Sequence, residues 1–304
     1  MAETRTLTIP EKAAGLRLDA WLGEHYGSRT AAVRAIDSGL VTVDGESRPK
    51  SWPVSEGESV VLTAPPAKPV VKGEAGPPIE VVYIDEWLMV VAKPPNLVVH
   101  PAPGHQTGTL SQLLAHQIGG GEEERAGIVH RLDQHTSGLM ILARQEESHR
   151  VLRQMLEDRD VKRGYKALVI GAPETREGTI DAAIGRDRRV RTRMSTSTDT
   201  PRDAVTHFVV NEGFPYATLL DVSLQTGRTH QIRAHLKVIG LPVAGDPEYG
   251  VAAAFGLERQ FLHSASLAFA HPITEEPLGF ESKLPQDLAD ALERARVGEV
   301  PLSN

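Results

Sequence analysis

A proline-rich segment between residues 64 and 78 constrains the fold more than any other feature of the chain. It begins with Ala64-Pro65-Pro66 and ends with Gly76-Pro77-Pro78. Proline fixes φ and has no backbone N–H, so such a stretch favours an extended spacer over a helix or a central strand. We therefore expect two separately folded parts. The expected ranges are an extension at 1–14, a small module at 15–65, the linker at 66–78 and a large domain at 79–304.

The small module is predicted to hold two short helices followed by a hairpin. Three apolar residues share the i, i+3, i+4 spacing of one helical face: Leu18, Trp21 and Leu22. A second helix is expected between a cap at Ser28 and a stop at Gly39. The alternating segment before Asp44-Gly45 then indicates a tight hairpin turn. Two helices and a hairpin would form a compact α/β platform.

The large domain mixes strands and helices without a regular βαβ rhythm. The expected strands are 79–83, 88–92, 165–170, 205–210 and 217–223. The expected helices are 109–117, 148–157 and 229–239. Because the two kinds of element are interspersed irregularly, we expect an α+β fold with a mixed sheet rather than a doubly wound one.

Composition restricts the classes of function. The chain has no cysteine, which excludes a disulfide framework, a thiolate zinc site and a cysteine nucleophile. No apolar run approaches the roughly 20 residues that a membrane span needs, and the first residues lead into no signal-peptide pattern. We therefore expect a cytoplasmic protein without a membrane partner. The histidines form no three-ligand cluster, so no metal site is expected.

The net charge of −7 argues against a uniformly basic nucleic-acid binder. Charges act locally, however, because screening limits their reach to about 8–10 Å. One short stretch is strongly basic, with only Asp187 opposing its arginines: Arg186, Arg188, Arg189, Arg191 and Arg193. This stretch is either a solvated loop or a place of phosphate contact.

Two polar segments stand at the edges of apolar runs. The first, His130 to Gly138, precedes a buried strand pattern that continues to Ala143. The second runs from Gln225 to Arg233, where a helix is expected to begin. Polar groups at the edge of a core must be hydrogen-bonded or used. A turn network in the first segment and an exposed helix start in the second remain open alternatives on spacing alone.

Taken together, these segments resemble the RluA-type pseudouridine synthases. The signature is His130-Arg131-Leu132-Asp133-x-x-Thr136-Ser137-Gly138-Leu139. Four further stretches match the family in order and rough spacing: Val91–Pro95, Lys162–Val169, Thr226–Arg233 and Gly245–Gly250. The resemblance covers roughly residues 79–275. It implies a largely antiparallel sheet flanked by helices, and the small module is similar to the S-four-type RNA-binding module often fused to this domain.

The resemblance also implies roles for individual residues. Asp133 would be the nucleophile, Arg233 its partner, and Tyr165 the ring that packs on the target uracil and helps to move its proton. Arg131 would help to hold the nucleotide out of its helix, since the glycosidic bond cannot be reached while the base is stacked. Further RNA contacts are expected from a set of arginines: Arg228, Arg186, Arg188, Arg189 and Arg191. A carboxylate can act as a covalent nucleophile. Attack on the ribose, attack on the base and removal of a sugar proton remain open.

The reaction that follows is isomerisation of uridine in structured RNA, without metal or small-molecule cofactor, by a monomer. The appended module favours the RluD- or RluC-like branches, whose substrate is large-subunit ribosomal RNA or a ribosome precursor. Two departures from the family are the pair Gln134-His135 and the modest basic charge of the module. The alternatives are a non-catalytic RNA-binding or ribosome-assembly factor on the same fold, and a small-molecule hydrolase that uses Asp133.

Overall fold

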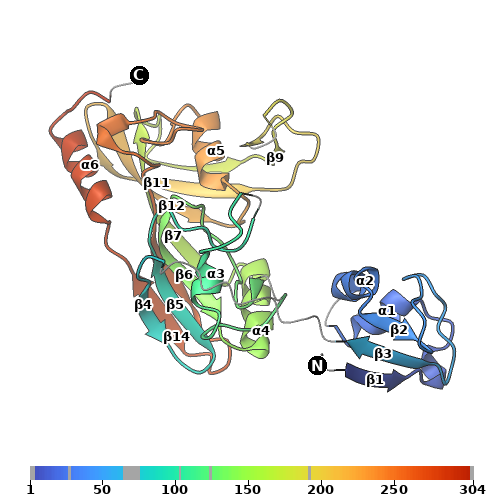
Figure 1. The fold of residues 1–304 in the computed structure, drawn as a ribbon. Helices are drawn as coiled ribbons and strands as arrows, with labels where there is room; N and C mark the ends of the chain where they lie inside the picture. The colour runs from blue at the N-terminus through green and yellow to red at the C-terminus, as the bar shows by residue number, and fades with distance from the viewer. Residues whose placement is uncertain are drawn as a thin grey trace. The chain divides into compact units, whose positions relative to one another are not determined.

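The computed structural model describes residues 4–26, 29–63, 76–102, 104–122, 125–190 and 193–301. The chain divides into two compact units, Met1–Lys72 and Gly73–Asn304. Both are drawn in Figure 1, and each is described by itself.

The smaller unit combines two helices with a three-stranded antiparallel sheet. Its elements are β1 (Thr4–Thr8), η1 (Glu11–Ala13), α1 (Leu18–Gly23), α2 (Arg29–Asp37), β2 (Val41–Val43) and β3 (Ser59–Thr63). The sheet order is β1-β3-β2. The three apolar residues predicted on one helical face are all buried in the core of this unit, so the predicted helix is confirmed. Ser28, the expected cap of the second helix, lies outside the described residues.

The predicted turn at Asp44-Gly45 is confirmed, but the strand that pairs with β2 differs from the expected one. Asp44 and Gly45 have positive φ angles of 50° and 81°, as a tight hairpin turn requires. Across the turn only Val43 pairs with Glu46 in an isolated bridge, and the strand partner of β2 is β3, after a long connection. On its other side β3 pairs with β1, from the segment expected to be an extension. Pairing on both sides satisfies the backbone groups of β3.

The larger unit holds one nine-stranded sheet and a separate two-stranded hairpin. Its strands are β4 (Glu80–Ile84), β5 (Leu88–Lys93), β6 (Ser137–Ala143), β7 (Lys162–Ile170), β8 (Glu177–Asp181), β9 (Gly185–Arg186), β10 (Met194–Ser195), β11 (Val205–Gly213), β12 (Ala217–Leu224), β13 (Leu262–Ala270) and β14 (Pro277–Glu281). Its helices are α3 (Leu110–Leu113), α4 (Glu146–Asp158), α5 (Gln231–Val238), η3 (Ala254–Gly256) and α6 (Gln286–Arg296). The five expected strands and the helices expected at 148–157 and 229–239 are confirmed. The helix expected at 109–117 is only the short α3.

The main sheet has the order β4-β5-β6-β13-β7-β12-β11-β8, with β14 paired to β13. All its strand pairs are antiparallel except β13 with β6, which run parallel. At this crossing a Cβ added to Gly138 would lie 2.2 Å from the backbone oxygen of Ser264, so only glycine permits the approach. The expected α+β class with a mixed, largely antiparallel sheet is confirmed.

The central strands are buried on both faces. Met89 and Val91 of β5 belong to one core cluster, whereas Leu88 and Val90 belong to the other. This alternation follows from the two-residue period of a strand. In Figure 1, α4 lies at one end of this unit and α5 lies at the other, beside β11 and the β9 hairpin. The polar segment that precedes β6 is therefore anchored to a rigid, fully buried strand.

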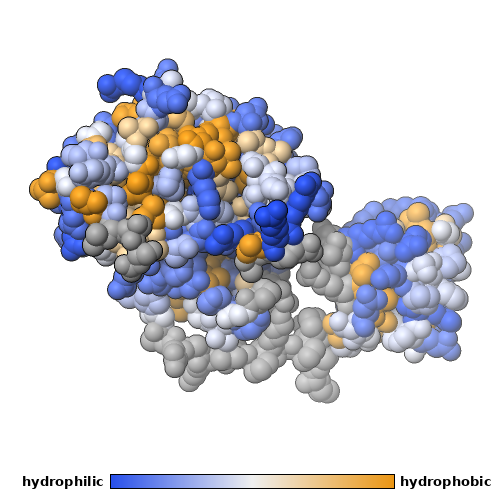
Figure 2. Space-filling view, turned by 90° about the horizontal axis from the view of Figure 1, so that it is seen from above, coloured by the Kyte–Doolittle hydropathy of each residue, from blue (hydrophilic) through white to orange (hydrophobic). Residues whose placement is uncertain are grey.

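The surface of the larger unit is mixed. Figure 2 shows an orange, apolar area on one face between blue and white ones. Single exposed apolar side chains are normal on folded proteins, so this face does not by itself identify a partner. Among the helices in the described part of the chain, none is both long and apolar enough to cross a membrane.

Candidate active site

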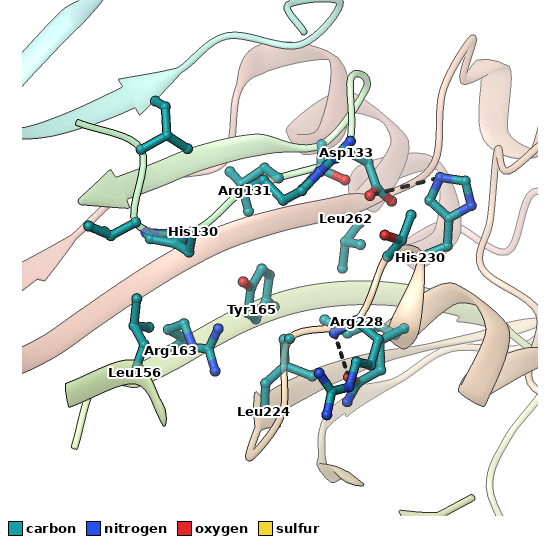
Figure 3. A pocket seen from close by; sticks show the side chains of 18 of the residues that line it. His130, Arg131, Asp133, Leu156, Arg163, Tyr165, Leu224, Arg228, His230 and Leu262 are labelled. Atoms are coloured by element: carbon teal, nitrogen blue, oxygen red, sulfur yellow. Dashed lines mark hydrogen bonds and ion pairs between the residues drawn. The ribbon is translucent and has the colours of Figure 1, made fainter. Parts of the chain in front are cut away.

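The two polar segments of the sequence meet at one cavity of about 330 Å³. One wall is formed by residues 128–133, which lead into β6, and the opposite wall by residues 227–233, which lead into α5. Arg163 and Tyr165 of β7 line the cavity as well. Figure 3 shows the side chains of these segments turned toward a common space. The sheet order therefore assembles a site from segments about a hundred residues apart.

Asp133 and Arg233 form an ion pair across this cavity. The Arg233 Nη1 donates to Asp133 Oδ2 at 3.1 Å. The Asp133 side chain keeps 14% of its surface exposed, whereas Arg233 keeps 6%. The carboxylate is thus held by a buried cation and remains open toward the cavity. The structure brings together the predicted nucleophile and its predicted partner.

Arg233 is itself fixed by acidic groups from the segment after α5. Asp246 accepts from Arg233 Nε at 2.7 Å and from Nη2 at 2.9 Å. Glu248 Oε2 lies 3.5 Å from Nη2, and the guanidinium lies 4.7 Å from the centre of the Tyr249 ring. A planar guanidinium held on two edges and one face has a single orientation. Nη1 is thereby aimed at Asp133.

The charges of this cluster are maintained despite burial. Burial by itself would lower the pKa of Arg233, but hydrogen bonds and charges of Asp246 and Asp133 raise it. Burial would raise the pKa of Asp246, but Arg233 and the backbone N–H groups of Tyr249 and Glu248 lower it. Arg233 and Asp246 therefore stay ionised across the neutral range.

Tyr165 lines the same cavity as Asp133. It is 6% exposed, and Figure 3 shows its ring near the middle of the pocket. Burial raises the pKa of its hydroxyl, the charge of Arg163 opposes this, and the charge of Asp133 adds to it. The hydroxyl is therefore a neutral donor and acceptor at physiological pH, next to a flat ring surface.

Two buried basic side chains, Lys93 and Arg259, anchor the loop that carries Asp133. The sequence indicated no individual role for either. Lys93 Nζ donates to the carbonyl oxygens of Pro94, Leu97 and Gln134 at 2.9, 3.0 and 3.0 Å. Three acceptors match the three protons of an ammonium group. Burial lowers the pKa of Lys93 to about 7, against the charge of Asp133. The only sequence signal was Lys93-Pro94 within the family stretch Val91–Pro95.

Arg259 supplies the second anchor. Its Nη1 donates to the carbonyl of His135 at 3.0 Å, and its Nε and Nη2 contact Asp287 of α6 at 2.6 and 2.9 Å. The side chain of Arg259 is 5% exposed. The C-terminal helix thus holds the loop two residues beyond Asp133. A contact spanning 124 residues leaves no local pattern in the sequence.

Part of the first polar segment is indeed a turn network. The Nε2 of His130 accepts the backbone N–H of Ile141 at 2.9 Å, and burial followed by the charge of Arg163 lowers the pKa of His130 to about 3. A neutral, partly buried ring that accepts a backbone N–H has a structural role. The turn network, which the sequence left open as an alternative for this segment, therefore accounts for the His130 side chain. It does not account for the Asp133 side chain.

Arg131 and Arg228 lie on opposite sides of the pocket. Arg131 is exposed, and its Nη1 lies 3.4 Å from His100 Nε2. Burial, together with the charge of Arg131, lowers the pKa of His100 to about 4, so the neutral ring accepts from Arg131. Arg228 Nε donates to the carbonyl of Asp203 at 3.1 Å. Both arginines thus line the cavity.

The basic stretch forms the β9–β10 hairpin. Arg188 pairs with Asp199 at 2.7 Å, and Arg193 lies 3.6 Å from Glu248. The Asp187 carboxylate accepts the backbone N–H groups of Arg189 and Val190, so it shapes the turn rather than neutralising a side chain. Arg186 is the last residue of β9 and is exposed, while Arg191 lies outside the described residues.

Potential metal ligands do not cluster in the described ranges. No group of three or more His, Asp or Glu there has the arrangement of a metal site. Asp133, Asp246 and Glu248 instead share Arg233 as an ion-pair partner.

Comparison with protein families matches the chain to RNA pseudouridylate synthase over residues 87–237. The chain is 40% identical over 296 residues to an uncharacterized RNA pseudouridine synthase, YlyB, of Bacillus subtilis, covering 95% of this chain and 97% of the relative. It is 42% identical over 305 residues to the ribosomal large subunit pseudouridine synthase D of Pseudomonas aeruginosa, with 93% of each chain covered.

A solved structure has the same fold. Human RNA pseudouridylate synthase domain containing 1 superposes with a TM-score of 0.55 at 26% identity, covering 70% of this chain and 86% of the human chain. The residues matched to the family run from β5 to α5. They include Asp133, Tyr165 and Arg233.

Proposed function

This chain belongs to the RNA pseudouridine synthase family, and from that premise we propose that it isomerises specific uridines to pseudouridine in large-subunit ribosomal RNA. The family makes it an isomerase. The ribosomal substrate is supported by relatives named ribosomal large subunit pseudouridine synthase D that align with nearly the whole chain. The observation that carries the proposal is a partly exposed carboxylate held by a buried guanidinium at the wall of a cavity.

In this reaction the bond from ribose C1′ to uracil N1 breaks and a bond from C1′ to C5 forms. N1 gains a proton and C5 loses one, so no electrons leave the substrate. We propose that the Asp133 carboxylate is the nucleophile, because it is open toward the cavity while Arg233 fixes its orientation. Attack on ribose C1′ gives a covalent intermediate, from which C5 of the detached uracil displaces the carboxylate. Attack on a base carbon gives an adduct that expels the carboxylate by elimination once the bond from C1′ to C5 has formed.

Tyr165 is proposed to hold the detached uracil and to move its proton. Its ring lies near the middle of the pocket, and its neutral hydroxyl can both donate and accept. General acid–base groups of this kind contribute about 10²–10⁴ in rate. The cavity admits one nucleotide rather than a duplex, so the target must be flipped out at a cost of a few kcal/mol. The exposed Arg131 side chain is placed to occupy the position that the flipped-out base leaves in the RNA helix.

The proposal also assigns the surfaces that bind RNA. The arginines of the β9–β10 hairpin and Arg228 would contact phosphates, since charge neutralisation dominates nucleic-acid affinity. Residues 15–65 would act as an S-four-type RNA-binding module joined by the linker at 66–78. We further propose that the enzyme works as a monomer, because one chain supplies every residue of the pocket. We also propose that it is located in the cytoplasm.

A non-catalytic role in ribosome assembly is less consistent with this site. Burying charges is expensive unless they are paired, and the cluster around Arg233 holds several buried charges whose arrangement leaves one carboxylate open. An RNA-binding surface needs no such group.

The test is to map pseudouridines in the ribosomal RNA of a strain that lacks the protein. Wild-type protein should restore each lost site, and Asp133→Asn should restore none, because the amide keeps the shape and loses the nucleophilic charge. Asp199→Asn, a change at an exposed carboxylate, should restore all. Restoration above about a tenth by Asp133→Asn would refute the nucleophile. Losses confined to transfer RNA would refute the substrate.

A further inference from the structure

His230 faces the nucleophile from the first residue before α5, and nothing in the assigned roles uses it. Its backbone is left-handed, with φ 54° and ψ 20°. The Nε2 lies 4.0 Å from Asp133 Oδ1, opposite the oxygen that Arg233 holds. Figure 3 shows the imidazole directed at the Asp133 carboxylate across the cavity.

The other ring nitrogen of His230 has a defined partner. Nδ1 lies 2.9 Å from the Tyr249 hydroxyl, and the two rings meet edge to face at 5.5 Å. The Tyr249 oxygen already accepts the backbone N–H of Met194 at 2.7 Å. Its own proton is therefore available for His230 Nδ1, the acceptor that lies beside it.

This arrangement selects one tautomer. An imidazole nitrogen that accepts a hydrogen bond leaves the proton on the other nitrogen. Because Nδ1 accepts from Tyr249, Nε2 carries the proton, and Nε2 is the atom that faces Asp133. Glu248 Oε2 lies 3.6 Å from Nδ1, but it also lies 3.5 Å from Arg233 Nη2 and is drawn toward that cation. Tyr249 is 4% exposed, so water does not compete for its hydroxyl.

We propose that His230 is a positioning residue for the nucleophile, with its Nε2–H set against Asp133 Oδ1 by the Tyr249 hydroxyl. Arg233 fixes one carboxylate oxygen, and His230 restrains the other. The 4.0 Å separation exceeds a direct hydrogen bond, and catalytic hydrogen bonds often tighten only when the substrate is in place. The inference rests on the proposed function, because it assumes that Asp133 is the reacting group.

Tyr249 also connects Arg233 and His230 to the β9–β10 hairpin. Its ring face contacts the Arg233 guanidinium while its hydroxyl contacts His230. The Met194 N–H that orients this hydroxyl belongs to β10 of the arginine-bearing hairpin. One buried side chain thus links both groups that restrain Asp133 to the backbone of the hairpin.

Two substitutions of His230 separate positioning from a backbone role. The amide nitrogen of glutamine reaches the place of Nε2, whereas that of asparagine reaches only the place of Nδ1. Asparagine, however, tolerates the left-handed conformation better than glutamine. Positioning predicts that His230→Gln is the more active variant, and a purely conformational role predicts that His230→Asn is.

The measurement is kcat and KM on a fragment of large-subunit ribosomal RNA, with the thermal midpoint of each variant. We expect His230→Asn to lower kcat by about 10- to 100-fold, the effect of a misplaced reacting group, with KM nearly unchanged. His230→Gln should recover at least tenfold of that loss although it is the less stable variant. Tyr249→Phe should lower kcat by about two- to tenfold, the worth of one hydrogen bond, and should add no loss to His230→Gln.

Equal or reversed activities of the two His230 variants would overturn the inference, as would a wild-type kcat for His230→Asn. Asp133→Asn is assayed beside them. If Asp133→Asn is inactive and His230→Gln is no more active than His230→Asn, only the positioning role fails. If Asp133→Asn retains more than about a tenth of the wild-type rate, the proposed function fails as well.

Discussion

Two arginine–aspartate pairs in the larger unit have the same closest contact and opposite surroundings. Arg233 Nε lies 2.7 Å from Asp246, and Arg188 Nε lies 2.7 Å from Asp199. The side chains of the first pair are 6% and 0% exposed, and those of the second are 58% and 74% exposed. The first lies beside Asp133, the proposed nucleophile, and the second includes Arg188 of the β9–β10 hairpin.

Because they differ in burial, the two ion pairs have different roles. A buried pair cannot exchange its partners for water, so it fixes the position of Asp133. An exposed pair contributes only about 0–1 kcal/mol, so a phosphate can replace Asp199 beside Arg188 at little cost. We therefore expect the buried cluster to determine the rate of the reaction and the hairpin to determine the affinity for RNA.

The largest effect is expected at Tyr165, on the buried side of this comparison. Tyr165→Phe keeps the ring and removes the hydroxyl, so kcat should fall by about 10²–10⁴ with nearly unchanged RNA binding. Single-turnover rates at saturating RNA and a binding assay measure the two quantities. An unchanged rate would show that the hydroxyl has no part in the slow step.

The next effect concerns stability and compares the two aspartates directly. Asp246→Asn leaves the buried Arg233 without its bidentate partner and should lower the free energy of unfolding of the larger unit by about 3–5 kcal/mol. Asp199→Asn is the matched control, and at an exposed pair it should stay within about 1 kcal/mol. Denaturant unfolding curves provide both values. Equal losses would mean that burial does not distinguish the two pairs.

A smaller effect, on affinity alone, is expected from the hairpin. Changing Arg188, Arg189 and Arg191 together to Ala should weaken RNA binding and flatten the slope of log affinity against log salt by about two, since each phosphate contact adds roughly 0.7–0.9. The rate at saturating RNA should stay the same. A control triple replaces other exposed cations: Lys162, Arg176 and Lys283. If both triples behave alike, the hairpin is only a solvated surface.

The smallest effect on the reaction is expected from removal of residues 1–75. The two units have separate cores, and the larger unit contains the whole pocket. RNA affinity and site choice should therefore weaken, because tethered binding units raise effective concentration, while turnover on short saturating RNA is retained. Complete inactivity of the shortened chain, with its fold intact by circular dichroism, would instead show that the smaller unit completes the site.

Particular residues show where the sequence was informative. The periodicity at 18–22 and the turn at Asp44-Gly45 were predictable because they depend on neighbouring residues. The pairing of β2 with β3 was not, because the partner strand lies beyond a long connection. In the site, the positions of Asp133, Tyr165 and Arg233 followed from resemblance to a family. The pairing of Arg188 with Asp199 and the turn made by Asp187 are contacts that the spacing of the arginines does not specify.

The sequence by itself determined the fold class and most of the expected elements, since hydrophobic period and turn chemistry are local properties of the chain. The resemblance of its motifs to a family indicated Asp133, Tyr165 and Arg233. Only the tertiary structure decided what surrounds Asp133. Lys93 contacts the loop from 41 residues away, Arg233 from 100 and Arg259 from 124. Lys93 reaches the loop because β5 pairs with β6. The other two contacts depend on a sheet in which β13 lies between β6 and β7, an order that no local pattern specifies. Buried charges are costly unless they are paired, and the fold determines which partners lie within reach. The contacts that hold Asp133 and its loop are therefore a property of the assembled sheet.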